Sequence, residues 1–348
     1  MFDITLNCSV STDLCSKVQK AFETAGNIIS SYLSLNTRIV LSASFESFCI
    51  SYPSLCEDRI LGFAAPARWI LMEDDDSIQR LYPQSLVKQF GLSTHLEYSQ
   101  NDIIASFNSD ASYWFEEDST PINETQYDFL YVMFHELHHG LGFSSAWDEF
   151  FTGYVTPIFA NDSIKEVDVD DDLVYKDNNK YKFYECAFDK YLILMENSQR
   201  TSEITKKLNT FFTENKDFTT EFPGSTQAEY ARQMYEIAQT PNSLGFLPRN
   251  STNNKDAVIL ETSIVPYLSG SSISHVDNKT YTNTPDFLMR ASVNNGINLD
   301  KEIISGGNYT LGPIGPKLKQ VLETMGYQTA DNPNPYKPKS IDGMLSEG

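Results

Sequence analysis

The segment His135-Glu136-Leu137-His138-His139 fits the pattern H-E-x-x-H, where x is any residue. Residues four positions apart lie on one face of a helix, so the imidazoles of His135 and His139 can reach a single metal ion. Glu136 is then placed to take a proton from a water molecule on that ion. The chain has 5 histidines in 348 residues, so a chance match is rare. The segment predicts a Zn²⁺ site with His135 and His139 as ligands and Glu136 as general base.

The residues around this pattern predict an amphipathic helix that begins near Thr125. Phe129, Met133 and Leu137 follow one another at helical spacing and form part of a core stripe. Glycines occur directly after the pattern, and a glycine in the left-handed conformation ends a helix sharply. We therefore expect the helix to end at Gly140 or Gly142.

A catalytic zinc ion usually has three protein ligands and keeps a fourth position for water. The two helix histidines therefore need a partner. His275 is favoured because small residues surround it in Ser269–Asp277 and allow close backbone packing. His95, in a polar stretch, is an alternative.

Two carboxylates and one further histidine complete the set of alternatives. Glu185 and Asp189 lie downstream of the pattern, and a carboxylate can also be the third ligand of zinc. His138 is adjacent to His139, so its side chain points around the helix. We expect His138 to support a ligand or to face solvent.

The charge of the chain excludes some partners. Its formal net charge is -21, and Lys and Arg do not form the clusters that phosphate contacts need. We expect no nucleic-acid partner. No apolar stretch approaches the length of a transmembrane helix, which predicts no membrane span. The sequence does not determine the oligomeric state.

The cysteines indicate an oxidising compartment. Cys8 with Cys15 and Cys49 with Cys56 form two close pairs that suit local disulfides, and Cys186 is left over. The sequence also holds 6 N-x-S/T sequons, which begin at Asn7, Asn123, Asn161, Asn250, Asn278 and Asn308. These features favour a secreted glycoprotein whose leader is absent from this numbering.

The periodicity along the chain predicts an α+β fold. Before the motif helix it predicts a helix capped by Ser11 to about Leu33, strands within 38–50 and 61–71, a helix over 83–90 and a strand over 102–108. From 147 to 260 the chain reads as an inserted, mainly helical lobe, with helices over 183–195, 202–212 and 226–238. A final helix is expected over 316–325.

This division gives four parts: 1–146 with the motif helix, the inserted lobe 147–260, a C-terminal subdomain 261–330, and a tail 331–348. Two acidic runs lie in the first two parts, at Glu73–Asp76 and Asp168–Asp172. Such runs are usually solvated, and Ca²⁺ binding is the alternative.

The segment from His135 to Gly142 extends the pattern to H-E-x-x-H-x-x-G and resembles the metzincin-type zinc metallopeptidases. In most metzincins a third histidine follows that glycine, but Ser145 stands there. The chain is similar instead to the leishmanolysin-like group and related secreted zincins of bacteria and fungi, in which an insertion precedes a Ser-His segment and a later methionine. Here Ser274-His275 and Met289 occupy those places, so the resemblance implies His275 as third ligand and Met289 in the Met-turn below the zinc.

The resemblance implies a zinc-dependent endopeptidase with a zincin-like fold. Glu136 would accept a proton from water and pass it to the leaving amine, while Tyr267 or Tyr281 could donate a further hydrogen bond. The strand Asp102–Phe107 would lie at a sheet edge and bind an extended protein or peptide substrate. The rivals are a zinc hydrolase of a non-peptide bond and a secreted binding protein that retains the fold. Intact Glu136 argues against the last, because a structural zinc needs no general base.

Overall fold

The computed structural model describes residues 1–56, 60–92, 97–161, 166–168, 181–212, 218–309 and 312–340. It is a mixed α+β structure with several small sheets. The chain divides into two compact units. The first unit comprises Met1–Arg68, Pro83–Gly142 and Tyr281–Pro335, and the second comprises Trp69–Tyr82, Phe143–Thr280 and Tyr336–Gly348. His95 and residues 169–172 of the second acidic run lie outside the described residues.

A four-stranded mixed sheet forms the base of the first unit, in the order β1-β2-β6-β3. Its strands are β1 (Phe2–Cys8), β2 (Ile39–Glu46), β6 (Ile103–Asn108) and β3 (Gly62–Pro66). The first three are parallel, and β3 runs antiparallel to β6. The prediction that the strand Asp102–Phe107 lies at an edge is wrong, because β6 pairs on both sides and β3 is the edge strand. β1 was not predicted, although its apolar and polar residues alternate as in a strand with one exposed face.

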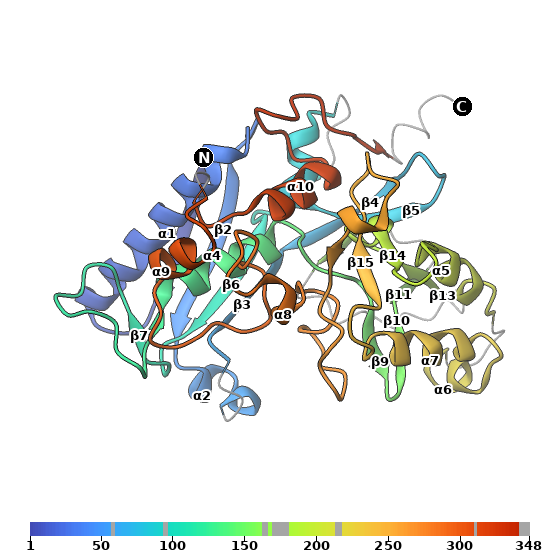
Figure 1. Ribbon diagram of the computed structural model, residues 1–348, viewed down its shortest axis with the longest axis horizontal. Helices are drawn as coiled ribbons and strands as arrows, with labels where there is room; N and C mark the ends of the chain where they lie inside the picture. The colour runs from blue at the N-terminus through green and yellow to red at the C-terminus, as the bar shows by residue number, and fades with distance from the viewer. Residues whose placement is uncertain are drawn as a thin grey trace. The chain divides into compact units, whose positions relative to one another are not determined.

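Two helices pack on one face of this sheet (Figure 1). α1 spans Thr12–Tyr32, and the side chain of Ser11 caps it as predicted. α4 spans Phe129–Gly140 and carries the H-E-x-x-H pattern. It begins four residues later than Thr125 because Asp128 is its N-cap, accepting hydrogen bonds from two backbone N–H groups. α4 ends at Gly140, and Gly142, with a φ of 98°, turns the chain away from the helix, as predicted.

The aromatic side chains of the first unit show which sheet face the helices cover. The ring of Phe107 in β6 lies 5.6 Å from Phe22 of α1 and 5.4 Å from Phe129 of α4. Phe45 in β2 lies 5.5 Å from Phe129. These residues therefore point to the helix side of the sheet, and the residues that alternate with them point to the opposite side.

Short elements complete the first unit. They are α2 (Phe48–Ser51), η1 (Pro53–Leu55), α3 (Gln84–Val87), η2 (Lys88–Phe90), β7 (Tyr113–Trp114), β8 (Tyr127–Asp128), α9 (Leu299–Ser305) and α10 (Pro316–Met325). The helices α3 with η2 and α10 lie where the sequence predicts them. Both predicted disulfides are present in this unit, Cys8–Cys15 and Cys49–Cys56.

The second unit contains several strands where the sequence predicted a mainly helical lobe. Its elements are β4 (Arg68–Glu73), β5 (Gln79–Pro83), β9 (Asp148–Phe151), β10 (Tyr154–Thr156), β11 (Ile158–Asn161), β12 (Glu166–Asp168), β13 (Tyr181–Tyr184), η3 (Asp189–Tyr191), β14 (Leu192–Leu194), α5 (Ser202–Leu208), α6 (Phe218–Glu221), η4 (Phe222–Gly224), α7 (Ala228–Ile237), β15 (Leu244–Phe246), η5 (Asn254–Asp256), β16 (Val258–Ile259), α8 (Asn278–Tyr281) and β17 (Lys339–Ser340). Two of the expected helices exist, as α5 and α7. The helix expected over Phe183–Met195 is wrong, because its aromatic and β-branched residues pair in the strands β13 and β14.

The acidic run that follows β4 is partly buried, contrary to the expectation of a solvated face. Asp74 is 2% exposed and pairs with Arg80 at 2.9 Å and with Lys190 at 2.6 Å. Partial burial raises the pKa of Asp75, but hydrogen bonds from Lys190 and Arg249 outweigh it and lower the pKa to about 2. These carboxylates are engaged by cations of the chain itself, which favours a structural role over Ca²⁺ binding.

Candidate metal site

The two motif histidines of the first unit turn their ring nitrogens toward each other. Both lie on α4 and are buried, and their Nε2 atoms are 3.1 Å apart. The Nδ1 atom of His135 lies 2.8 Å from the carbonyl oxygen of Leu288, to which it can donate a proton. This bond fixes the ring and makes Nε2 the nitrogen whose lone pair can bind a metal.

This geometry fits a zinc ion. Two nitrogens at the usual Zn–N distance in a tetrahedral site are about 3.3 Å apart, close to the observed separation. Burial and the charge of Arg290 lower the pKa of His135 to about 4, although the bond to Leu288 acts in the opposite direction. The ring is therefore neutral at ordinary pH, which is the form that binds metal.

Glu136 follows His135 in α4 and is hydrogen-bonded to the edge strand β3. Burial raises the pKa of its carboxyl to about 8, and a hydrogen bond from the backbone N–H of Ala64 partly opposes this shift. A positive charge beside this carboxyl would lower its pKa. β3 thus supplies a fixed donor that holds the proposed general base.

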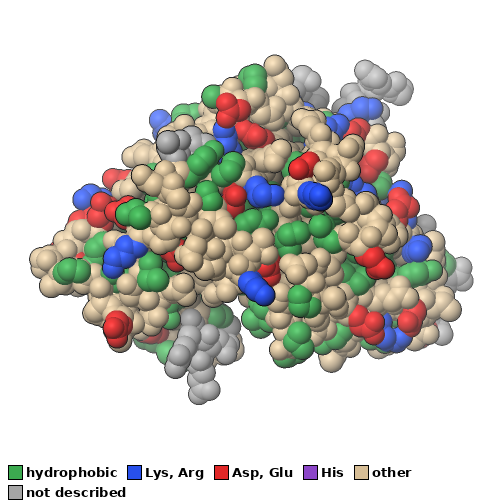
Figure 2. Space-filling view, viewed as in Figure 1, with side chains coloured by type: hydrophobic (Ala, Val, Ile, Leu, Met, Phe, Trp, Pro, Cys, Tyr) green, Lys and Arg blue, Asp and Glu red, His purple; other side chains and the backbone are tan. Residues whose placement is uncertain are grey.

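His138 is not available as a ligand. It is completely buried, and its Nδ1 and Nε2 atoms lie 2.7 Å from the carbonyl oxygen of Phe134 and 2.8 Å from the hydroxyl of Tyr32. Burial lowers its pKa to about 4. The alternative that it faces solvent is wrong, because the neighbouring helix α1 covers it. In the view of Figure 2 no described histidine reaches the surface.

The segment with Met289 belongs to the first unit. Met289 is completely buried, and the residues around it form a turn closed by a hydrogen bond from Arg290 N to Phe287 O at 3.2 Å. The carbonyl that orients His135 is that of Leu288, one residue before the methionine. A turn at this place agrees with the role that the resemblance implies, and that role stays a prediction.

His275 belongs to the second unit, where it is 6% exposed. Its Nδ1 atom lies 2.9 Å from the carbonyl oxygen of Ser271, and its own carbonyl accepts a hydrogen bond from Glu261 N at 2.8 Å. The contact with Ser271 leaves Nε2 as the nitrogen for a metal, as in His135. Among the described residues, His135, His139 and His275 make up a group of buried side chains that could hold one metal ion, each with one ring nitrogen.

The carboxylate alternatives have other partners in the second unit. Glu185 accepts hydrogen bonds from Arg80, Ser202 and Thr205 at 2.6–3.0 Å. Asp189 accepts from the Ser145 hydroxyl and from the backbone N–H of Ala146 and Cys186. Both carboxylates therefore hold the second unit together. This explains Ser145, which stands where most metzincins have a histidine and here binds Asp189.

The two tyrosines proposed as donors differ in their described contacts. The hydroxyl of Tyr267 lies 3.2 Å from the carbonyl oxygen of Trp147, and burial together with the nearby Asp148 raises its pKa. Tyr281 is 4% exposed and lies at the end of α8. Tyr267 is engaged within the second unit, and the donor role of both tyrosines stays a prediction.

Three groups that position the motif helix were missed by the sequence reasoning. They are the N–H of Ala64, the carbonyl of Leu288 and the hydroxyl of Tyr32. The first two are backbone groups, which nearly every residue carries, so no residue type in the sequence predicts these contacts. For Tyr32, one of 19 tyrosines, only the fold selects it as the partner of His138.

The comparison with known families places the chain in one of them. The model of the SPBPB7E8-like family matches residues 1–341. The chain belongs to the SPBPB7E8-like family. It is 31% identical over 365 aligned positions to an uncharacterized protein of Schizosaccharomyces pombe, PB7E8.01, covering 94% of this chain and 62% of that protein. The chain therefore spans less than two thirds of this relative, and no solved structure matches it at a significant level.

Proposed function

We propose that this member of the SPBPB7E8-like family is a zinc-dependent endopeptidase. The observation that carries the proposal is the pair His135 and His139, whose Nε2 atoms face each other at 3.1 Å on the helix that also carries Glu136. A purely structural metal site needs no such carboxyl, because all positions around the ion are filled by protein ligands. We propose His275 as the third ligand, Met289 as the residue below the metal, and Tyr267 or Tyr281 as a further donor.

Zinc, when bound, supplies a Lewis acid that polarises a carbonyl group and lowers the pKa of water to about 7. The protein's own groups supply the remaining steps. Glu136 accepts a proton from the attacking water and transfers it to the leaving amine. The N–H of Ala64 holds its carboxylate in place, and the carbonyl of Leu288 holds the ring of His135.

The edge strand β3 is the proposed substrate-binding strand. Leu61 O accepts from Asn108 N, and Ala67 N donates to Asp102 O, both at 2.9 Å, so the odd-numbered residues of β3 direct their backbone groups toward β6. The even-numbered residues therefore direct theirs to the open edge. An extended peptide can add there as another strand.

This open edge offers mostly acceptors. Gly62, Ala64 and Pro66 each present a carbonyl, but proline has no N–H and the N–H of Ala64 is used by Glu136. A bound peptide would thus be held mainly through its own N–H groups. The substrate-binding role that the resemblance implied for Asp102–Phe107 (β6) is therefore proposed for β3 instead.

The Glu136→Gln substitution tests both the catalytic and the metal parts of the proposal. We expect wild-type protein to cleave an unstructured polypeptide such as casein and Glu136→Gln to lose cleavage while it retains zinc. Glu196→Gln, which changes an exposed glutamate, should behave as wild type. A wild-type protein that holds zinc but cuts no polypeptide would refute the peptidase.

Zinc content tests the ligands separately. His139→Ala and His275→Ala should each lower zinc occupancy, whereas His138→Gln should keep it because His138 has other partners. Full occupancy in His275→Ala would show that His275 is not a ligand.

We also propose that the protein is secreted. Its two disulfides lie in the first unit, and disulfides persist in oxidising compartments. No helix in the described part of the chain is long and apolar enough to cross a membrane. Detection of the protein in the culture medium of expressing cells, with both disulfides formed and N-linked glycans attached, is the expected result. Retention inside the cell with reduced cysteines would contradict it.

A further inference from the structure

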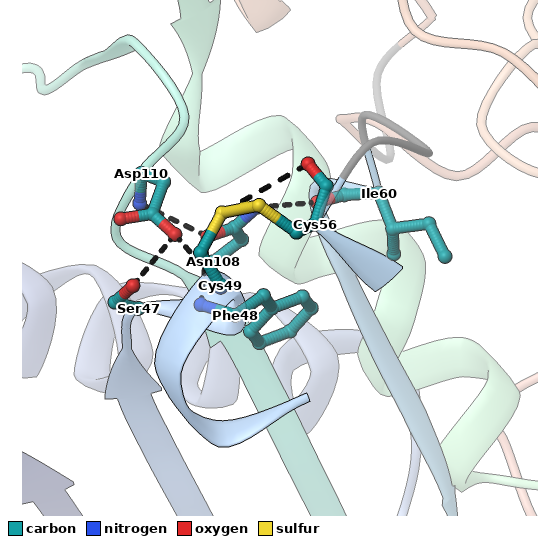
Figure 3. The surroundings of a disulfide bond; sticks show 7 residues. All are labelled: Ser47, Phe48, Cys49, Cys56, Ile60, Asn108 and Asp110. Carbon is teal, nitrogen blue, oxygen red and sulfur yellow. Dashed lines mark hydrogen bonds between the residues drawn. A yellow bond between two sulfur atoms is a disulfide. The ribbon is translucent and has the colours of Figure 1, made fainter. Parts of the chain in front are cut away.

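A disulfide-closed loop connects β2 to the edge strand β3 and is fixed at both ends. The carboxylate of Asp110 accepts hydrogen bonds from the hydroxyl of Ser47 at 2.8 Å and from the backbone N–H of Cys49 at 3.1 Å. Cys49 is linked to Cys56, so the carboxylate and the disulfide together restrain this part of the loop (Figure 3). The loop is therefore anchored to the chain that follows β6.

Asn108, the last residue of β6, holds the two sides of the same loop. Its side-chain oxygen accepts from the backbone N–H of Phe48 at 3.2 Å, and its side-chain nitrogen donates to the carbonyl of Ile60 at 3.0 Å (Figure 3). Ile60 lies just before β3, so this amide ties the start of the edge strand to the loop. Such restraint lowers the entropy that the loop would lose on binding a ligand.

Three aromatic rings pack together between this loop and β3. The ring of Phe48 lies 5.2 Å from Tyr52 and 5.7 Å from Phe63, and Tyr52 lies 5.7 Å from Phe63. Phe48 is completely buried, whereas Tyr52 and Phe63 are partly exposed. The buried ring thus supports two rings that still present apolar surface to solvent.

The position of Phe63 in the ladder decides which face this surface occupies. Phe63 pairs with Ser106 of β6, one residue before Phe107, which points to the helices. Phe63 therefore projects from the opposite face of the sheet, next to the open edge of β3. In a strand added to this edge, side chains opposite Phe63 on the same face would lie about 4.5–5.5 Å from it, measured between Cβ atoms.

We propose that Tyr52 and Phe63 form an apolar subsite that selects extended peptides with an aliphatic or aromatic side chain on this face. The inference rests on the proposed role of β3 as the substrate-binding strand. The occupant is a side chain of the peptide added to β3, because the ring of Phe63 belongs to this edge strand and the ring of Tyr52 packs against it. The subsite sets substrate preference and takes no part in bond cleavage.

Peptide binding to the Glu136→Gln protein loaded with zinc tests this subsite without cleavage. The side-chain amide introduced by Glu136→Gln retains an oxygen that can accept the Ala64 hydrogen bond. One probe is a short capped peptide that alternates Leu and Thr, which presents an apolar face in either alignment. The other replaces every Leu by Ser. We expect the Leu peptide to bind about tenfold more tightly, as measured by fluorescence anisotropy.

Substitutions at the rings locate the preference. In the Glu136→Gln background, Phe63→Thr and Tyr52→Ser should reduce the preference for the Leu peptide several-fold, and Phe63→Leu should largely restore it. Ile50→Ser is the matched control, because Ile50 lies in the same loop and is 81% exposed but is not one of the three packed rings. Thermal unfolding of each variant identifies any loss of fold.

The outcomes separate this inference from the proposed function. Equal binding of the two peptides, or an unchanged preference in folded Phe63→Thr, would overturn the subsite even if the wild type is a peptidase. A preference that depends on Phe63 together with a wild type that cuts nothing would support the subsite and refute the peptidase. Absence of binding by both peptides would overturn the role of β3 and the subsite together.

Discussion

Arg80 is the side chain whose removal should most disturb the second unit. It is completely buried, and its guanidinium makes hydrogen bonds to Asp74, Asp76, Glu185 and Ser202 at 2.9–3.0 Å. These bonds engage all of its N–H donors. Arg80→Met would keep much of the volume but leave the buried carboxylate of Glu185 without its cation, while Asp74 would keep Lys190. Breaking a buried pair in this way costs about 3–5 kcal/mol.

For a unit of this size, that loss corresponds to a fall of about 6–20 °C in the unfolding temperature. Differential scanning calorimetry of wild type and Arg80→Met measures it directly. Adding Glu185→Gln to Arg80→Met should recover part of the loss, since one buried charge is then removed. The control is Arg232→Met, because Arg232 pairs with Glu229 in solvent and such pairs are worth less than about 1 kcal/mol. If Arg80→Met shifts the unfolding temperature no more than Arg232→Met, this reasoning is refuted.

Three further substitutions test other parts of the structure. The pKa of Asp75 is lowered from its ordinary value of 3.8 to about 2. The ionised carboxylate therefore stabilises the fold at pH values above 3.8, and this contribution is lost as the pH falls toward 2. Asp75→Asn should therefore be less stable than wild type at neutral pH, and chemical denaturation should show the difference shrinking in acid; a constant difference would contradict this. Gly140→Ala should destabilise the protein, because a Cβ there would lie 2.4 Å from Ile103 Cγ2. This clash should outweigh the higher helix propensity of alanine. A rise in unfolding temperature would show instead that the sheet shifts to accommodate the added methyl group. Tyr32→Phe removes the hydroxyl partner of His138 and should cost about 1–3 kcal/mol in urea unfolding while zinc content stays unchanged; loss of zinc would show that His138 acts on the metal.

Local sequence signals were sufficient where a feature depends on neighbours in the chain. The helix with Ser11 as its cap, the turn at Gly142 and the helix over Pro316–Met325 follow from capping, backbone freedom and periodicity. The facing of His135 and His139 belongs to the same class, because the helix repeat alone brings residues four apart together. The short separation of each cysteine pair likewise predicted both disulfides.

Features that depend on distant pairing were missed or misplaced. β1 was missed although its alternating apolar and polar residues are a local strand signal, and pairing with β2 gives it its place in the sheet. The prediction of a helix over Phe183–Met195 was wrong because β11 and β15 pair with the two halves of this segment as strands. The family resemblance implied an edge position for Asp102–Phe107, whereas β6 pairs with both β2 and β3.

The sequence by itself determined the chemistry of this protein: two imidazoles and a carboxyl on one helix, and cysteines close enough to bridge. Only the tertiary structure decided what holds that chemistry in place. The N–H of Ala64 at Glu136, the carbonyl of Leu288 at His135 and the cations around Asp74 come from segments remote in the chain. A helix fixes the spacing of its own residues through a local repeat, whereas contacts between remote segments arise only when the whole chain packs.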